Sequence, residues 1–264
     1  MGVKTKLTLI ELNNLFPLYN FISIVPTTSG IIDTTYIIST QYKSYILKKY
    51  ERDISIKVKK DISLLRLLKS YGFNVSTCID KKDEWFIYEK LIGSEPVNIQ
   101  TYHIQSLARF LAKLHKSTVK IPCITNKKVE NDVIKALKYT KYNFFRYYKI
   151  LESLKYFSNN NNHFIHGDIF KDNTIFNGSK IGVIDFIDSS CGSFSFDIAV
   201  ALIGFDIKKK NTYYINLFIK TYNQRALKKL NKQDIIKKMT IASKFYALKR
   251  IYKYKNTLKA KELL

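Results

Sequence analysis

The pattern of apolar positions begins as a helix and then changes to strands. Thr8 and Glu11 have the spacing of a capping box, and apolar residues follow at intervals of three and four, which predicts a short helix. Runs rich in β-branched and aromatic residues come next and predict an antiparallel meander. The predicted strands cover residues 21–27, 34–40 and 44–50.

A second helix and two further strands are predicted after the meander. Residues 54–71 carry leucines on one face, and Gly72 follows them as a residue that favours the end of a helix. Strand patterns at residues 74–79 and 84–90 flank a polar turn. The first 90 or so residues therefore predict a small β-rich unit with one inserted helix.

From residue 98 onward the pattern is mostly helical. One amphipathic helix is followed by a long helix predicted over residues 129–157, and a run of asparagines ends it. Two short strands, 174–177 and 180–184, surround a Gly-Ser turn. A helix from about Phe196 and two basic helices complete the chain.

These patterns predict an α+β fold of two lobes. The N-terminal lobe is expected over residues 1–92 and the larger, mostly helical C-terminal lobe over residues 93–264, with a cleft near residues 88–98.

Composition narrows the class of protein. Hydrophobic residues make up 46% of the 264 positions and charged residues 25%, which excludes a disordered or fibrous chain. The three cysteines, Cys78, Cys123 and Cys191, are scattered and lack the spacing of a metal site, so we expect a reducing compartment and no zinc. No leader or membrane-spanning stretch is visible, so a cytoplasmic protein is expected.

The charge is strongly positive and unevenly distributed. The formal net charge is +24, and residues 207–264 contain 17 basic and two acidic side chains. Such a stretch is typical either of lysine-coated helices or of a site for an anionic partner.

Two acidic residues stand in loops beside predicted strands. Asp168 lies in the segment HGDIFKDN, five residues before Asn173, and Asp185 follows the second short strand in IDF. Phosphoryl transfer needs one carboxylate that accepts the proton of a hydroxyl, while an amide oxygen and a second carboxylate hold Mg²⁺.

These segments resemble a known family. HGDxxxxN followed by IDF is similar to the catalytic and metal-binding loops of the aminoglycoside phosphotransferase and protein-kinase-like superfamily. The segments SGIIDTTYIIST, YILKKYE, FIHGDIFKDNTIFNGSKIGVIDFIDSSCGSFSFDIAVAL and SKFYALKRIYKY resemble the homoserine kinases built on this fold. The resemblance implies a protein-kinase-like fold, ATP and Mg²⁺, with Asp168 as the base and Asn173 and Asp185 as metal ligands.

The resemblance also implies a nucleotide site. Lys48 would contact the α- and β-phosphates, and Ile46, on the same face of its strand, would line the adenine pocket. Asp61, one methylene shorter than the Glu that is usual there, would be either the partner of Lys48 or a solvated side chain. Ser29 and Gly30 would cover the phosphates. Glu89 and Leu91 would form the hinge that binds the adenine edge through the backbone.

Four further residues have more than one interpretation. His166 and Asp197 are interpreted as scaffold residues that hold the catalytic loop. Asp188 and Asp33 are candidates for contacting the substrate, and Asp188 fits a buried structural carboxylate equally well.

The leading hypothesis is an ATP-dependent kinase of a small-molecule hydroxyl, with L-homoserine as the expected substrate. The basic C-terminal region disfavours polycationic aminoglycosides, whereas a carboxylate would tolerate it. The alternatives are a choline, ethanolamine or aminoglycoside kinase of the same fold, and a basic non-catalytic protein that binds nucleotide or nucleic acid. A nucleic-acid or membrane partner is not expected, because no recognised motif for either interrupts the helices.

Overall fold

The computed structural model describes residues 3–27, 33–121, 123, 128–158 and 163–264. The chain divides into two compact units. The N-unit comprises Met1–Glu95 together with Thr174–Ile187, and the C-unit comprises Pro96–Asn173 and Asp188–Leu264. The sequence placed one boundary after residue 92, whereas a hairpin from much later in the chain packs with the first unit. Asp185, which follows this hairpin, therefore belongs to the N-unit.

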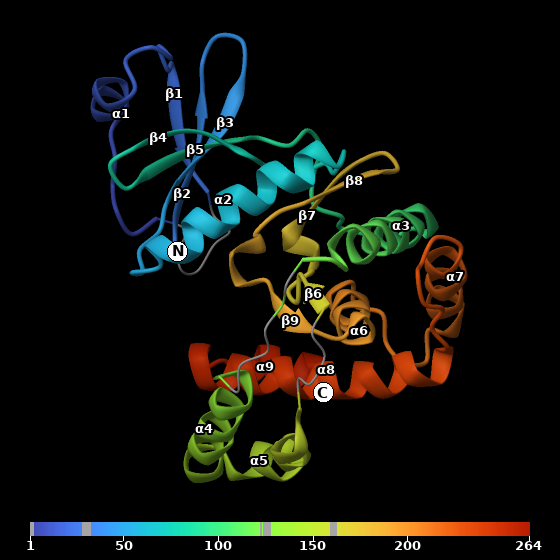
Figure 1. The fold of residues 1–264 in the computed structure, drawn as a ribbon. Helices are drawn as coiled ribbons and strands as arrows, with labels where there is room; N and C mark the ends of the chain where they lie inside the picture. Colours follow the sequence, from blue (N-terminus) through green and yellow to red (C-terminus); the bar gives the residue numbers. More distant parts are fainter. Residues whose placement is uncertain (1–2, 28–32, 122, 124–127, 159–162) are drawn as a thin grey trace. The chain divides into compact units, whose positions relative to one another are not determined.

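The N-unit is built on a five-stranded antiparallel sheet in the order β1-β2-β3-β5-β4 (Figure 1). Its strands are β1 Ser23–Pro26, β2 Thr34–Ser39, β3 Ser44–Lys49, β4 Cys78–Lys82 and β5 Trp85–Glu89. The helices are α1 Leu9–Leu15, which begins at the predicted Thr8–Glu11 capping box, and α2 Ser55–Ser70. Gly72 follows α2 with a φ of 72°, which favours glycine and ends the helix.

Side-chain alternation gives the sheet two chemically different faces. Leu47 of β3 packs with Trp85 and Ile87 of β5 in a buried core that also contains α1 residues. Its neighbours Ile46 and Lys48 therefore point to the opposite face. Lys49 returns to the first side, where its Nζ lies 2.8 Å from Glu84.

One strand differs from its predicted position. Residues 74–76 do not join β4, because Val75 pairs in parallel with Val183 of a separate hairpin. That hairpin consists of β7 Thr174–Asn177 and β8 Lys180–Val183. Gly182 fits there because a Cβ would meet Leu91 Cδ1 at 2.6 Å and Asn74 Nδ2 at 2.7 Å. The hairpin thus docks closely on the segment that follows β5.

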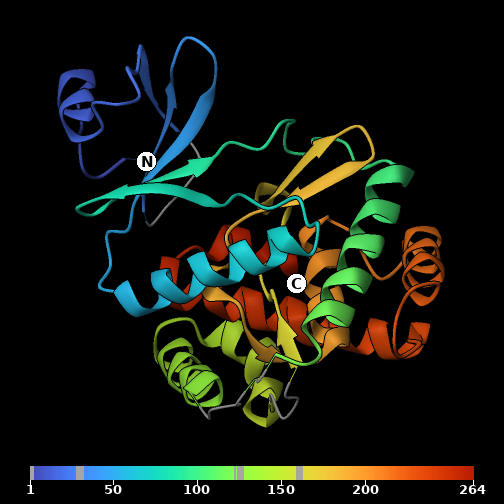
Figure 2. The ribbon, with the colours of Figure 1, turned by 45° about the horizontal axis from the view of Figure 1, so that its top comes forward.

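The C-unit is mostly helical. Its helices are α3 Thr101–Thr118, α4 Lys128–Asn143, α5 Phe145–Leu151, α6 Phe194–Gly204, α7 Thr212–Asn223, α8 Lys232–Tyr254 and α9 Thr257–Leu263. Two short strands, β6 His163–Ile165 and β9 Ser190–Gly192, pair antiparallel. Helix α6 is apolar on all sides and is buried from Phe196 to Gly204, with α8 packed along it, while α3 and α7 lie side by side (Figures 1 and 2).

The long helix predicted over residues 129–157 is wrong. The chain leaves the helical conformation at Phe144, whose φ and ψ are −146° and 57°, so α4 and α5 are separate and a 3₁₀ turn at Glu152–Tyr156 follows. The break lets α4, α5 and the 3₁₀ turn pack their apolar residues around Leu248 and Ile251 of α8. Tertiary packing therefore decided this boundary.

The C-terminal basic region contains one helix more than the two predicted from its sequence. Lys255 adopts a left-handed conformation with a φ of 54° and ends α8, and the side chain of Asn256 then accepts a hydrogen bond from the backbone of Lys259 to begin α9.

The cysteines also differ from expectation. Cys123 and Cys191 of the C-unit form a disulfide with Cα atoms 5.6 Å apart, whereas reduced, scattered cysteines were expected. Cys78 is buried and free. Across the described part of the chain, every helix is too short or too polar to span a membrane.

Candidate active site

The buried carboxylate of Asp197 anchors the loop that contains Asp168. Asp197, in the first turn of α6, is fully buried, and its oxygens accept the backbone N–H groups of Gly167 at 2.7 Å and His166 at 3.1 Å. Burial raises the pKa of Asp197, but hydrogen bonding to His115 and to the loop outweighs it and holds the pKa below its usual range. The prediction that Asp197 anchors this loop is confirmed.

Asp197 is itself positioned by two residues for which the sequence predicted no role. His115 Nε2 lies 3.1 Å from Asp197 Oδ2, and His115 Nδ1 lies 2.8 Å from the Tyr222 hydroxyl. Because the carboxylate can only accept, the proton of a neutral His115 belongs on Nε2, and Tyr222 then donates to Nδ1. The only sequence signal for this network was a histidine at the C-terminal end of an apolar helix face.

Hydrogen bonds within the loop fix the positions of Asp168 and Asn173. Gly167 has a φ of 74°, a conformation that favours glycine immediately before Asp168. The backbone N–H of Asp168 donates to Nδ1 of the buried His166 at 3.2 Å, which supports the scaffold interpretation of that histidine. The Asn173 amide donates from Nδ2 to the Asp168 carbonyl at 2.8 Å, so its Oδ1 is left as an acceptor.

Helix α8 supplies two more neighbours of the loop. The Tyr246 hydroxyl donates to the Gly167 carbonyl, and Lys249 Nζ lies 3.6 Å from Asp168 Oδ1. Both side chains of this ion pair are partly exposed, at 22% for Lys249 and 29% for Asp168. The segment SKFYALKRIYKY contains both α8 residues, but periodicity alone gave neither of them a role.

In the N-unit, Lys48 and Asp185 come together. Lys48 Nζ lies 3.6 Å from Asp185 Oδ1 and 4.8 Å from the centre of the Tyr50 ring. Asp185 follows β8 with a φ of 64°, a strained conformation for a residue with a side chain. The hairpin therefore aims this carboxylate at the amine predicted to bind phosphate.

Asp61 behaves differently from its predicted role as the partner of Lys48. Its side chain is buried on α2, and among the described residues its Oδ1 has no hydrogen-bond partner. Burial raises the pKa of Asp61 to about 7; Lys48 acts to lower it and Asp185 to raise it. The carboxylate that forms an ion pair with Lys48 is Asp185, whereas the influence of Lys48 on Asp61 is to lower its pKa.

The residues predicted to bind adenine lie on β3, at the end of β5 and just after β5. Ile46 is half-buried on the Lys48 face of β3, opposite Tyr88 of β5. Both backbone groups of Glu89 make hydrogen bonds inside the N-unit. Its N–H donates to the Thr77 carbonyl at 3.0 Å, and its carbonyl accepts a hydrogen bond from the Ser76 hydroxyl. Leu91 follows the sheet and packs on Gly182.

The remaining predicted residues are separate from these clusters. Ser29 and Gly30 lie outside the described residues. Both oxygens of Asp33 are engaged, one by the Glu51 backbone and the other by Arg52, at 3.2 Å each. Asp188 is exposed at the end of a 3₁₀ turn, so the alternative of a buried structural carboxylate is wrong.

Each of the two units carries one of the residues that the sequence predicts as a metal ligand, Asn173 in the C-unit and Asp185 in the N-unit. The described residues contain no cluster of three or more His, Cys, Asp and Glu side chains that could hold a metal ion. Asn173 offers an amide oxygen and Asp185 an exposed carboxylate, both hard ligands of the kind that Mg²⁺ prefers.

The sequence of this chain matches the model of one protein family. A family model described as "Phosphotransferase enzyme family" matches residues 23–227. No curated protein matches the chain.

Solved structures share the fold at low sequence identity. The choline kinase LicA from Streptococcus pneumoniae is 17% identical with a TM-score of 0.70, covering 96% of this chain and 97% of that one. The aminoglycoside phosphotransferase APH(2″)-IIa in complex with gentamicin is 18% identical with a TM-score of 0.67, covering 98% and 97%. Spectinomycin phosphotransferase APH(9)-Ia, in complex with ADP and spectinomycin, is 13% identical with a TM-score of 0.67, covering 98% and 93%. These similarities confirm the α+β, protein-kinase-like fold class.

Proposed function

Because the chain belongs to the phosphotransferase enzyme family, we propose that it transfers the γ-phosphoryl group of ATP to a hydroxyl of a small molecule. The observation that carries the proposal is the construction of the Asp168 loop: Asp197 holds it through the N–H groups of His166 and Gly167, and Asn173 donates to the Asp168 carbonyl. Similar folds have been solved with ATP or ADP bound, which supports ATP as the phosphoryl donor.

Asp168 acts as the base in the proposed reaction. Its carboxylate accepts the proton of the acceptor hydroxyl while the hydroxyl oxygen forms a bond to the γ-phosphorus. The bond from that phosphorus to the β–γ bridging oxygen breaks, and ADP leaves with the electron pair. The anchored backbone fixes the position of the carboxylate, which is what proximity catalysis requires.

The N-unit cluster serves the nucleotide. Lys48 donates its ammonium hydrogens to the phosphates, and the Tyr50 ring limits the directions in which that side chain extends. We expect Asn173 and Asp185 to hold Mg²⁺, which offsets negative charge on the phosphates when it is bound. Leu91 is proposed to contact the adenine edge through its backbone, with Ile46 against the adenine ring. The Glu89 N–H already donates to Thr77, so Glu89 is proposed to contribute only through the second lone pair of its carbonyl, which also accepts the Ser76 hydroxyl.

The charges beside Asp168 favour an acceptor that carries a negative group. Lys249 lies 3.6 Å from the base, and Arg250 lies 5.8 Å from the centre of the Phe170 ring in the same loop. Burial and the neighbouring Asp168 carboxylate raise the pKa of Asp172, while Arg250 and Lys259 act in the opposite direction. These cations repel a polycationic aminoglycoside and attract a carboxylate. Together with the sequence resemblance, they support L-homoserine as the acceptor.

The aromatic rings near the loop give choline less support. Phe170 and Tyr246 lie 4.9 Å apart and could in principle face a quaternary ammonium group. However, Lys249 lies 5.1 Å from the centre of the Tyr246 ring, and the Arg250 guanidinium lies 5.8 Å from the centre of the Phe170 ring. Both rings therefore already make cation–π contacts with side chains of the protein itself.

Phosphoryl transfer to individual acceptors tests the proposal. Purified protein is incubated with ATP and Mg²⁺ and with L-homoserine, choline or an aminoglycoside, and the phosphorylated product is identified by ³¹P NMR. We expect a phosphate ester with L-homoserine, and no product with the Asp168→Asn variant. Product from choline or the aminoglycoside alone would overturn the assignment of the acceptor but not of the reaction. Salt-sensitive DNA binding with no response to ATP would overturn both.

A further inference from the structure

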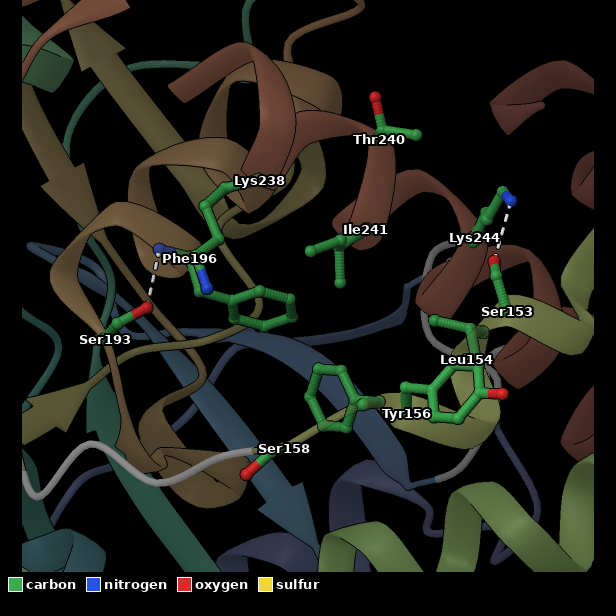
Figure 3. Close-up of a pocket in the computed structure, with 11 residues that line it drawn as sticks. Ser153, Leu154, Tyr156, Ser158, Ser193, Phe196, Lys238, Thr240, Ile241 and Lys244 are labelled. Atoms are coloured by element: carbon green, nitrogen blue, oxygen red, sulfur yellow. Dashed lines mark hydrogen bonds between the residues drawn. The ribbon is translucent and has the colours of Figure 1, made fainter. Parts of the chain in front are cut away.

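A surface pocket of the C-unit lies apart from the candidate catalytic residues. It has a volume of about 330 Å³ and opens between the 3₁₀ turn after α5, the start of α6 and the first half of α8 (Figure 3). Its lining residues are Ser153, Leu154, Tyr156, Phe157, Ser158, Ser193, Phe196, Lys238, Thr240, Ile241 and Lys244. The volume is at the lower end of the range for small-molecule sites.

The pocket combines an apolar inner wall with a basic rim. Phe196 and Ile241 line its interior, and Lys238 and Lys244 stand towards opposite ends of it (Figure 3). None of the lining residues is acidic. Among the described residues neither lysine pairs with a carboxylate, and the hydrogen bond recorded for Lys244 is to Ser153 at 2.8 Å. An ammonium group without a counter-ion beside an apolar wall suits an anion that also carries an apolar part.

The hydroxyl groups add hydrogen-bonding capacity at the rim. Ser193 caps α6 by accepting the backbone N–H of Phe196 at 3.2 Å, and its own hydroxyl hydrogen remains able to donate. Thr240 accepts a hydrogen bond from Lys209 at 3.1 Å, which brings a third lysine to this side of α8. The Thr240 hydroxyl itself donates to the Ile236 carbonyl at 3.3 Å, so the donors available to an oxyanion at the opening are the lysines and the Ser193 hydroxyl.

The pocket is separate from the Asp168 loop. Neither Asp168 nor Asn173 lines it. Phe245 of α8 packs against the lining residues Phe157 and Phe196, with ring centres 5.2 and 5.8 Å away, so an aromatic cluster supports the wall of the pocket. Lys249 lies eight residues beyond Ile241 on this helix, a rise of about 12 Å.

We propose that this pocket is a second ligand site, specific for a small carboxylate or phosphate that bears an aromatic ring or short apolar chain. The apolar part lies against Phe196 and Ile241, and the anionic group pairs with Lys238 and with the Ser193 hydroxyl. Lys244, held by Ser153, contributes charge from the other end. The site functions independently of the phosphotransfer reaction.

Calorimetric titration with 3-phenylpropionate tests the proposal, because this probe combines one carboxylate with one ring. We expect saturable binding to the full-length protein that persists with ATP, Mg²⁺ and L-homoserine present. The neutral amide of the probe and inorganic phosphate should each bind about tenfold more weakly, because each lacks one of the two recognised features. No saturable binding, or competition by ATP or L-homoserine, overturns the proposal.

Matched variants locate the site. Lys238→Glu should weaken binding of the probe by about tenfold or more, whereas Lys237→Glu, the same change at an exposed neighbour, should leave it unchanged. Ser153→Trp changes an exposed lining position and should block the opening without disturbing the core. Equal effects of the two lysine variants would show a non-specific charge response and overturn the proposal.

Discussion

The ammonium of Lys249 lies 3.6 Å from the carboxylate of Asp168, although the two residues are far apart in the sequence. The Asp168 loop resembles a known sequence pattern, whereas the cation beside it comes from α8, near the C-terminal end of the chain. The pairing places an ammonium group beside the carboxylate that we propose as the base, an arrangement that the sequence pattern did not predict.

Replacement of Asp168 by Asn should abolish most of the activity. The amide cannot accept the proton of the hydroxyl, so kcat should fall by about 10²- to 10⁴-fold. Circular dichroism and the melting temperature should stay close to those of the wild type, because Asp168 is partly exposed. Retention of wild-type kcat would exclude Asp168 as the base.

Lys249→Met should change the acceptor preference. Loss of the ammonium removes the attraction for a carboxylate, so kcat/KM for L-homoserine should fall by about tenfold or more, mainly through KM, and Lys249→Arg should restore much of it. Steady-state kinetics with L-homoserine and with choline provide the comparison. An equal loss for both acceptors would mean that Lys249 only positions Asp168.

Asp61→Asn should stabilise the ligand-free protein above neutral pH. The pKa of Asp61 is raised from an ordinary value of 3.8 to about 7, so the folded state binds this proton more tightly than the unfolded state. Its contribution to stability is therefore full below pH 4 and is lost as the pH rises through 7, by at most about 1.4 kcal/mol per pH unit. Melting temperatures of both proteins should diverge between these limits, and parallel curves would contradict the raised pKa.

Asp197→Ala should destabilise the C-unit strongly. The substitution leaves His115 and two buried loop N–H groups without their acceptor, which costs about 3–5 kcal/mol of unfolding free energy. Asp206→Asn is a suitable control, because Asp206 is exposed and pairs only at the surface with Lys171, and Asn tolerates its left-handed backbone. Chemical denaturation measures both variants, and similar midpoints would contradict an anchoring role for Asp197.

Most of the local structure followed from local signals. The capping box at Thr8, the three strands of the meander and the β7–β8 hairpin formed where spacing and turn residues predicted them. The long helix over residues 129–157 was wrong, because its apolar periodicity continues through Phe144 while packing on α8 requires a break there. Periodicity detects a buried face, but it does not reveal a change in direction between two helices that share that face.

The sequence by itself determined the chemistry that this chain can offer: an acid and an amide in one loop, an acid after a strand, and a lysine on a strand face that alternation assigns. Such features depend on residue type and short spacing, so they are readable without coordinates. Only the tertiary structure decided that Asp185 pairs with Lys48 and that α8 places Lys249 beside Asp168. It also decided that Asp61 is buried, with an Oδ1 that has no hydrogen-bond partner among the residues the structure describes. These relationships depend on how distant segments pack, and packing is set by the whole core rather than by any local pattern.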